Sequence, residues 1–222
     1  MKGEYYLSNN HATNLENKQI KPLPIVIAIM IGAFIGLFSE TALNMAFTNI
    51  MEDFRIEPHV VQWLTTGYLL VLGILVPVTA LLLQWFTTRQ LFSASPIFSI
   101  VGTLVGALAP NFEILLLARV IQAIGTGLLL PLMTNVILVI FPPHRRGTIM
   151  GMMGLVIMFA PAVGPTLSGL IVDSLGWQSI FWLCLPLLIF TFAYGLIYMQ
   201  NLSTITKPKI DTLSIILSAT GF

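Results

Sequence analysis

The chain has 222 residues, of which 56% are hydrophobic and 9% are charged, and its formal net charge is +1 at pH 7. Soluble domains carry about 25% charged residues, so this composition excludes an ordinary soluble domain. No basic cluster indicates nucleic acid as a partner. The single cysteine, Cys184, excludes an internal disulfide and a thiolate metal cluster. No sequence pattern indicates a cofactor, a metal site or an enzyme active site.

Apolar residues come in runs of about 20, the length that an α-helix needs to cross the hydrocarbon core of a bilayer. The sequence therefore predicts an all-α integral membrane protein with a six-helix transmembrane bundle over 23–199. The polar segment 1–22 has no apolar core, so it is expected to be a cytoplasmic tail and not a cleaved signal peptide. A cytoplasmic linker (200–211) and the start of a truncated further helix (212–222) follow the bundle. The six expected spans are 23–47, 60–83, 91–109, 112–141, 148–172 and 179–199.

Cationic side chains indicate which side of the membrane each connection faces. The N-terminal tail and the connections on its side hold most of them: Lys2, Lys18, Lys21, Arg89, Arg145, Arg146, Lys207 and Lys209. The opposite side holds Arg55 together with the acidic residues Glu52, Asp53, Glu57, Glu113 and Asp173. The positive-inside rule therefore predicts a multi-pass protein of the cell membrane with a cytoplasmic N-terminus.

The first span carries a stripe of small and polar residues. Gly32, Gly36, Glu40, Asn44 and Thr48 recur every four residues, so they lie along one face of a helix. An ionised carboxylate facing lipid at this depth would cost several kcal/mol. We therefore expect the stripe to face protein or a water-filled cavity.

The fifth span is rich in helix-weakening residues. Pro161 and Pro165 each remove a backbone hydrogen bond, and Gly164 and Gly169 allow a neighbouring helix to approach closely. This pattern indicates a hinge or a sliding face. The alternative is that glycine and proline are simply commoner in membrane helices.

Four stretches resemble, in order and spacing, the motifs of one transporter family: ETALNMAF (40–47), LARVIQAIGTG (117–127), APAVGPTLSG (160–169) and GWQSIFWLCLP (176–186). Together they resemble the N-terminal six-helix half of a Major Facilitator Superfamily transporter, in particular the fourteen-helix drug:proton antiporters of the lincomycin-resistance type. The residues that fill the main motif places are Glu40, Thr41, Asn44, Ala46, Arg119, Gln122, Gly125, Pro161, Gly164, Pro165 and Gly169.

One stretch departs from the family pattern. Between the second and third spans the family has a charged loop that acts as a cytoplasmic latch between the two halves, and here the sequence reads ALLLQWFTTRQ (80–90). Gln84 stands where the family has Asp, whereas Arg89 is retained. Because an amide cannot form an ion pair, we expect a weaker or differently organised latch.

The resemblance implies proton-coupled export of drugs or lipophilic compounds by alternating access, in which two six-helix halves rock about a central site. The implied partners are small lipophilic substrates, protons, the lipid bilayer and the missing C-terminal half. Two alternatives stay open. One is a non-transporting membrane scaffold or truncated remnant, and the other is a transporter of a specific metabolite or peptide on the same fold.

Glu40 is the expected proton-coupling residue, because it is the only acidic residue expected to be buried within a span, whereas Glu113 stands at the very start of one. Counted at about 1.5 Å per residue from the outer ends of their spans, Glu40 and Arg119 lie at depths that agree within about one helical turn. We expect the two to approach directly or through water, with Asn44 and Gln122 completing the network. The alternative is a static buried ion pair that fixes the packing of the helices.

The residues that contact substrate are harder to choose. Gln62, Thr66, Tyr68 and Met158 are candidates, because aromatic, polar and flexible methionine side chains suit varied lipophilic guests. Trp177 lies near the end of a span, so it is expected to anchor the helix at the membrane interface.

Overall fold

The computed structural model describes residues 22–199 and 201, and these residues form helices joined by short connections. Six spans are long and apolar enough to cross a membrane, which confirms the expected number among the described residues. The tail, the linker and the further helix lie outside the described residues, apart from residues 22 and 201. The helices are α2 (Pro22–Met45), α3 (Phe47–Phe54), α4 (Pro58–Val61), α5 (Trp63–Trp85), α6 (Thr88–Ala107), α7 (Phe112–Ile140), α8 (Pro143–Leu175) and α9 (Gln178–Tyr198).

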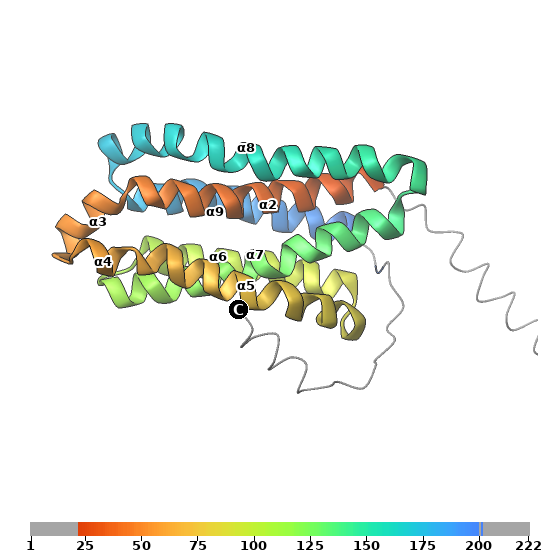
Figure 1. Ribbon diagram of the computed structural model, residues 1–222, viewed down its shortest axis with the longest axis horizontal. Helices are drawn as coiled ribbons and strands as arrows, with labels where there is room; N and C mark the ends of the chain where they lie inside the picture. The colour runs from red at the N-terminus through yellow and green to blue at the C-terminus, as the bar shows by residue number, and fades with distance from the viewer. Residues whose placement is uncertain (1–21, 200, 202–222) are drawn as a thin grey trace, which may run out of the picture.

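The helices pack as two groups of three. Helices α2, α8 and α9 contact one another and form the first group. Helices α5, α6 and α7 contact one another and form the second. Figure 1 shows the first group lying above the second. Helix α2 also contacts α7 and so joins the groups. It is the most enclosed span, with 61% of its most apolar stretch buried, against 11% for the span formed by α4 and α5.

Glycines allow α2 and α7 to approach closely. A Cβ atom on Gly36 would lie 2.6 Å from Thr126 Oγ1, and one on Gly32 would lie 2.9 Å from Leu129 Cδ2. Real side chains do not tolerate these distances, so only glycine fits without a shift of the neighbouring helix. The small half of the α2 stripe therefore faces protein, as its spacing predicts.

The expected polar connection between the first two spans is largely helical. It contains α3 and α4, and α3 ends where Arg55 adopts a left-handed conformation with φ of 53°. The N–H group of Ile56 donates to the carbonyl oxygen of Met51 at 3.1 Å across this end. Hydropathy marks only the apolar part of a helix, so polar turns beyond that part are missed.

Helix α8 begins earlier than its apolar run. Pro142 is extended, and Pro143 occupies the first turn, where its missing N–H group costs nothing. The expected start was 148, in the apolar segment, so Arg145 and Arg146 lie in the helix and not in a loop. Arg146 Nε donates to the carbonyl oxygen of Phe141 at 2.9 Å, which satisfies an acceptor at the end of α7.

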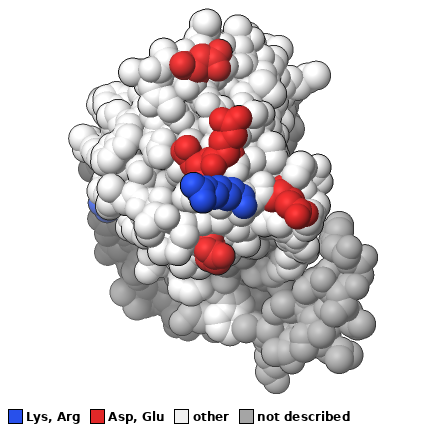
Figure 2. Space-filling view, turned by 90° about the vertical axis from the view of Figure 1, so that its left-hand side faces the viewer, with Lys and Arg blue, Asp and Glu red and all other residues white. Residues whose placement is uncertain are grey.

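Charged residues separate toward the two ends of the bundle. Figure 2 shows the end formed by α3 and α4, where acidic side chains surround one Arg. The acidic residues near this end are Glu52, Asp53, Glu57, Glu113 and Asp173, and the cation is Arg55. Arg89, Arg145 and Arg146 lie at the starts of α6 and α8, at the other end. The charge asymmetry expected from the sequence thus holds in three dimensions among the described residues.

Candidate functional site

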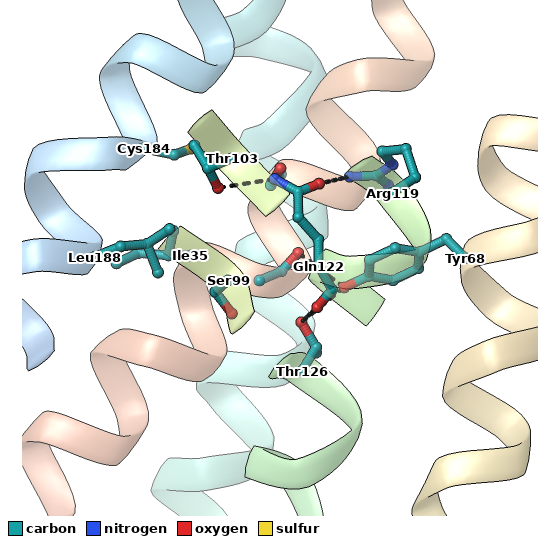
Figure 3. A pocket seen from close by; sticks show the side chains of 11 residues that line it. Ile35, Tyr68, Ser99, Thr103, Arg119, Gln122, Thr126, Cys184 and Leu188 are labelled. Carbon is teal, nitrogen blue, oxygen red and sulfur yellow. Dashed lines mark hydrogen bonds between the residues drawn. The ribbon is translucent and has the colours of Figure 1, made fainter. Parts of the chain in front are cut away.

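Arg119 lies in the middle of the bundle and is fully buried on α7. Its Nη1 group donates to Gln122 Oε1 at 2.9 Å, one turn further along the same helix. Gln122 Nε2 in turn donates to Thr103 Oγ1 of α6 at 2.8 Å. Figure 3 shows this chain of side chains running from α7 to α6. Gln122 thus uses both ends of its amide and sets the position of one guanidinium nitrogen.

Tyr68 of α5 forms the second contact of the guanidinium. The Arg119 Cζ atom lies 4.4 Å from the centroid of the Tyr68 ring, and only 1% of Tyr68 is exposed. A desolvated contact between a cation and an aromatic face is worth about 2 kcal/mol. The Tyr68 hydroxyl donates to Thr126 Oγ1 at 2.8 Å (Figure 3). The Gly36 carbonyl oxygen lies 3.4 Å from the same hydroxyl. These bonds connect α5 to α7 and bring it close to α2.

Glu40 is not ion-paired with Arg119 in this conformation. Within the described ranges the one ion pair closer than 4 Å joins His59 and Glu57 at 3.1 Å, on the surface. Glu40 is half-buried on α2, and its charge and that of Arg119 interact at longer range. The Nε and Nη2 groups of Arg119 are buried and make no hydrogen bond. The site therefore holds a buried cation with two guanidinium nitrogens that lack an acceptor. Of the approach expected from the sequence, directly or through water, the direct ion pair is not formed.

A small cavity adjoins Arg119 between α2, α5, α6, α7 and α9. It leaves about 10 Å³ for the centre of a water molecule, which is room for roughly one water. Its polar lining includes Ser39, Ser99 and Thr103, and Cys184 also contributes to it (Figure 3). The cavity is too small for a drug-like compound, because such sites have volumes of about 300–1,000 Å³.

Asn44 belongs to a different contact from the one expected. Its Oδ1 atom accepts a hydrogen bond from Thr65 Oγ1 of α5 at 2.6 Å. The expected network is thus divided: Gln122 contacts Arg119, whereas Asn44 joins α2 to α5.

The glycine- and proline-rich segment of α8 packs against α2. Gly164 lies directly against Thr41, so that a Cβ atom at this position would overlap the Thr41 hydroxyl. Pro161 and Pro165 lie within a helix that continues to Leu175, and a Cβ atom on Gly169 would meet no neighbouring atom within 4 Å. Close packing against Thr41 therefore requires glycine at position 164, whereas position 169 has room for a side chain.

The two latch residues lie apart. Arg89 Nη2 donates to the carbonyl oxygen of Leu196 at 3.4 Å, near the C-terminal end of α9, where carbonyls lack helical donors. Gln84 lines an open groove of about 690 Å³ between α5, α7 and α8, together with residues such as Asn135 and Met153. Within the six-helix bundle Arg89 thus contacts α9 and not Gln84.

The four candidate substrate residues do not line one cavity. Tyr68 is buried against Arg119. The other three are exposed: Gln62 just before α5, Thr66 on α5 and Met158 on α8. The expectation for Trp177 is wrong: it is 1% exposed, and its indole N–H donates to Asp53 Oδ2 at 2.7 Å.

Sequence reasoning missed the roles of Tyr68, Thr103 and Thr126. Tyr68 and Thr103 come from α5 and α6, so no spacing along α7 relates them to Arg119, whereas Thr126 lies on α7 itself, seven residues after Arg119. The sequence signal available for Tyr68 and Thr103 was a polar residue within an otherwise apolar span.

The family model described as Major Facilitator Superfamily matches residues 29–214. The lincomycin resistance protein LmrB of Bacillus subtilis (strain 168) is 64% identical over 93% of this chain and 43% of its own length. LmrB of Listeria monocytogenes is 62% identical over 92% of this chain and 44% of its own length. The chain thus spans about half the length of the curated relatives it matches.

Solved structures with low sequence identity share the fold. The peptide transporter POT, crystallised in complex with alafosfalin, superposes with a TM-score of 0.72 at 14% identity, over 88% of this chain and 44% of that structure. The human organic anion transporter MFSD10 superposes with a TM-score of 0.70 at 16% identity, over 90% of this chain and 54% of that structure. The chain belongs to the Major Facilitator Superfamily of membrane transporters and comprises a six-helix half of that fold.

Proposed function

We propose that this chain forms half of the translocation pathway of a proton-coupled exporter of drugs or lipophilic compounds, which works by alternating access. The names of the relatives, lincomycin resistance proteins, support drug export. The other half of the pathway would come from a segment equivalent to the remaining length of those relatives. The charge asymmetry of the bundle supports a cytoplasmic N-terminus.

The observation that carries the coupling proposal is the state of Arg119. A buried cation without a bound carboxylate is costly, and here the Nε and Nη2 nitrogens, with three N–H bonds between them, lack an acceptor. Glu40, the only acidic residue away from the ends of a described span, lies on α2, which packs against α7. A carboxylate that could take up those donors is therefore already at hand on a neighbouring helix.

The proton steps follow from the charges. A proton from the outside binds a carboxylate oxygen of Glu40 and makes the side chain neutral, which lowers its cost at membrane depth. When that proton leaves toward the cytoplasm, the carboxylate regains its charge and is stabilised by the open donors of Arg119. The two states favour different distances between α2 and α7, and this difference couples proton movement to helix movement.

The other predicted residues keep their proposed roles. Helix α8 would act as the hinge at Pro161 and Pro165, because it packs on α2 through Gly164. Gln84 and Arg89 would form the cytoplasmic latch with the second half. Gln62, Thr66 and Met158 are exposed and so are free to contact substrate or the second half.

The test is ethidium efflux with and without an uncoupler. It compares the chain alone with a completed transporter, in which the chain is joined to the remaining C-terminal part of Bacillus subtilis LmrB. We expect uncoupler-sensitive efflux from the completed transporter and none from the chain alone. Loss of efflux in Glu40→Gln, with retained efflux in the exposed control Glu52→Gln, is the expected pattern.

Three outcomes would contradict the proposal. Full uncoupler-sensitive export by Glu40→Gln would remove Glu40 from coupling. No efflux of any lipophilic dye by the completed transporter, with efflux intact in LmrB itself, would favour a non-transporting remnant. Transport of one metabolite or peptide alone would favour a specific transporter on the same fold.

A further inference from the structure

We propose that Tyr68 is the positioning residue for Arg119: its ring holds the guanidinium in place without occupying the N–H donors that Glu40 needs. The inference rests on the proposed function, since it assigns a role within the same coupling site. It replaces the sequence-based expectation that Tyr68 contacts substrate.

The geometry leaves Arg119 with two kinds of contact. One is the hydrogen bond from Nη1 to Gln122, and the other is the Tyr68 ring, whose centroid lies 4.4 Å from Cζ. An aromatic face attracts a cation through its quadrupole, but it offers no lone pair in the plane of the guanidinium. The Nε and Nη2 donors therefore remain open although the side chain is fully buried.

Tyr68 is itself held firmly in this position. Its hydroxyl donates to Thr126 Oγ1 at 2.8 Å, and its side chain is 1% exposed. Thr126 lies on α7, one turn from Gln122, so the Tyr68 ring on α5 is anchored to the helix that carries Arg119. A ring fixed in this way cannot turn outward to meet a substrate without breaking buried hydrogen bonds.

Few titratable groups surround Arg119. The groups close enough to interact electrostatically with Arg119, when they are ionised, are Tyr68 from α5, Glu40 from α2 and Cys184 from α9. Helix α6 faces the site with Ser99 and Thr103, which do not titrate. Helix α8, which packs on α2, carries its charged residues only near its ends. Tyrosine and cysteine are ordinarily uncharged near pH 7, so Glu40 is the group whose titration Arg119 would sense.

Removing the Tyr68 ring would change the equilibrium between the ionised and protonated forms of Glu40. Without Tyr68 the guanidinium loses one of its two partners, so the ionised form of Glu40 becomes more favourable relative to the protonated form. Export that requires protonated Glu40 would then need a lower pH. We expect the pH of half-maximal export to fall by about one unit, the size expected when one close charge contact is lost.

The experiment measures ethidium transport against pH in everted membrane vesicles that contain the completed transporter. Tyr68→Leu removes the ring, Tyr68→Phe keeps the ring and removes the hydroxyl, and Leu70→Ala, an exposed position on the same helix, is the control. We expect an acid shift in Tyr68→Leu alone. Tyr68→Phe should lower the rate at most, because it keeps the aromatic face.

A rate loss in Tyr68→Leu with an unchanged pH profile would show that Tyr68 only fills space. An equal shift in Tyr68→Phe would assign the effect to the hydroxyl, and both results overturn the proposal. If Tyr68→Leu does not accumulate, Tyr68→Met makes the same comparison with a side chain of similar length. Glu40→Gln in the same vesicles tests the proposed function separately, so failure of Tyr68 positioning and failure of Glu40 coupling are distinguishable.

Discussion

Thr79 Oγ1 of α5 donates a hydrogen bond to the backbone carbonyl of Gly127 on α7, at 3.1 Å. Pro131 lies four residues after Gly127 within α7 and has no N–H group, so this carbonyl lacks its helical donor. Thr79 is fully buried and supplies the missing donor from the neighbouring helix. A proline that would otherwise weaken α7 is thus compensated by a side chain of α5.

We therefore expect Thr79→Val to lower the free energy of unfolding by about 1–3 kcal/mol, the cost of a buried acceptor left without a donor. The measurement is the midpoint of thermal unfolding of the purified protein in detergent. The matched control is Thr134→Val, because the Thr134 hydroxyl donates only within its own helix, to the Leu130 carbonyl at 3.5 Å. Equal midpoints for the two variants would contradict the compensation.

The second prediction concerns the contact between α2 and α7. Gly36→Ala would place a Cβ atom 2.6 Å from Thr126 Oγ1, the acceptor of the Tyr68 hydroxyl. We expect a loss of about 1–3 kcal/mol in stability, as for other overpacked sites. Gly73→Ala is the control, since no atom lies within 4 Å of the added Cβ. Alanine at that helical position should stabilise the protein by about 0.5–1 kcal/mol, and a result of the same sign at both glycines would be a contradiction.

The third prediction concerns the end formed by α3. Asp53→Ala would leave the indole N–H of buried Trp177 without its acceptor, so we expect a loss of about 1–3 kcal/mol. Asp53→Asn keeps an acceptor oxygen and should lose less. Thermal unfolding of these variants is compared with Glu52→Ala, which changes an exposed carboxylate one residue earlier. An effect of Glu52→Ala as large as that of Asp53→Ala would argue for a general charge effect.

The fourth prediction tests orientation in the membrane. Cys184 is 1% exposed, so the unmodified protein should not react with a maleimide that cannot cross membranes. In a Cys184→Ala background, Glu57→Cys should react in intact cells, because the acidic end is expected to face outward. Arg145→Cys, at the start of α8, should react only after the cells are permeabilised. The reverse pattern would invert the proposed topology.

The ends of the helices show where sequence reasoning loses accuracy. The apolar run of the fifth span begins near 148, whereas α8 starts at Pro143 and includes the arginine pair. A backbone continues as a helix through polar residues once the first turn is formed, and hydropathy does not register this. Proline at the first helical turn was the signal that could have placed the start correctly.

The surroundings of Trp177 show a different kind of error. Its position near the end of a span is typical of an interfacial anchor. In the fold it packs against Phe54, with ring centroids 5.7 Å apart, and hydrogen-bonds Asp53. Both partners belong to a segment expected from the sequence to be a polar connection between two spans, so no pattern could relate them to Trp177.

The sequence by itself determined the six membrane-crossing helices, the segregation of charge to two ends and the motif residues on α2, α7 and α8. It could do so because a chain of about 20 apolar residues can satisfy its backbone in lipid only as a helix. Only the tertiary structure decided what surrounds Arg119. A buried cation can be stabilised by a carboxylate or by an aromatic face. Both α2 and α5 pack against α7, so the contact with Tyr68 in place of Glu40 depends on where each side chain lies along its helix relative to Arg119.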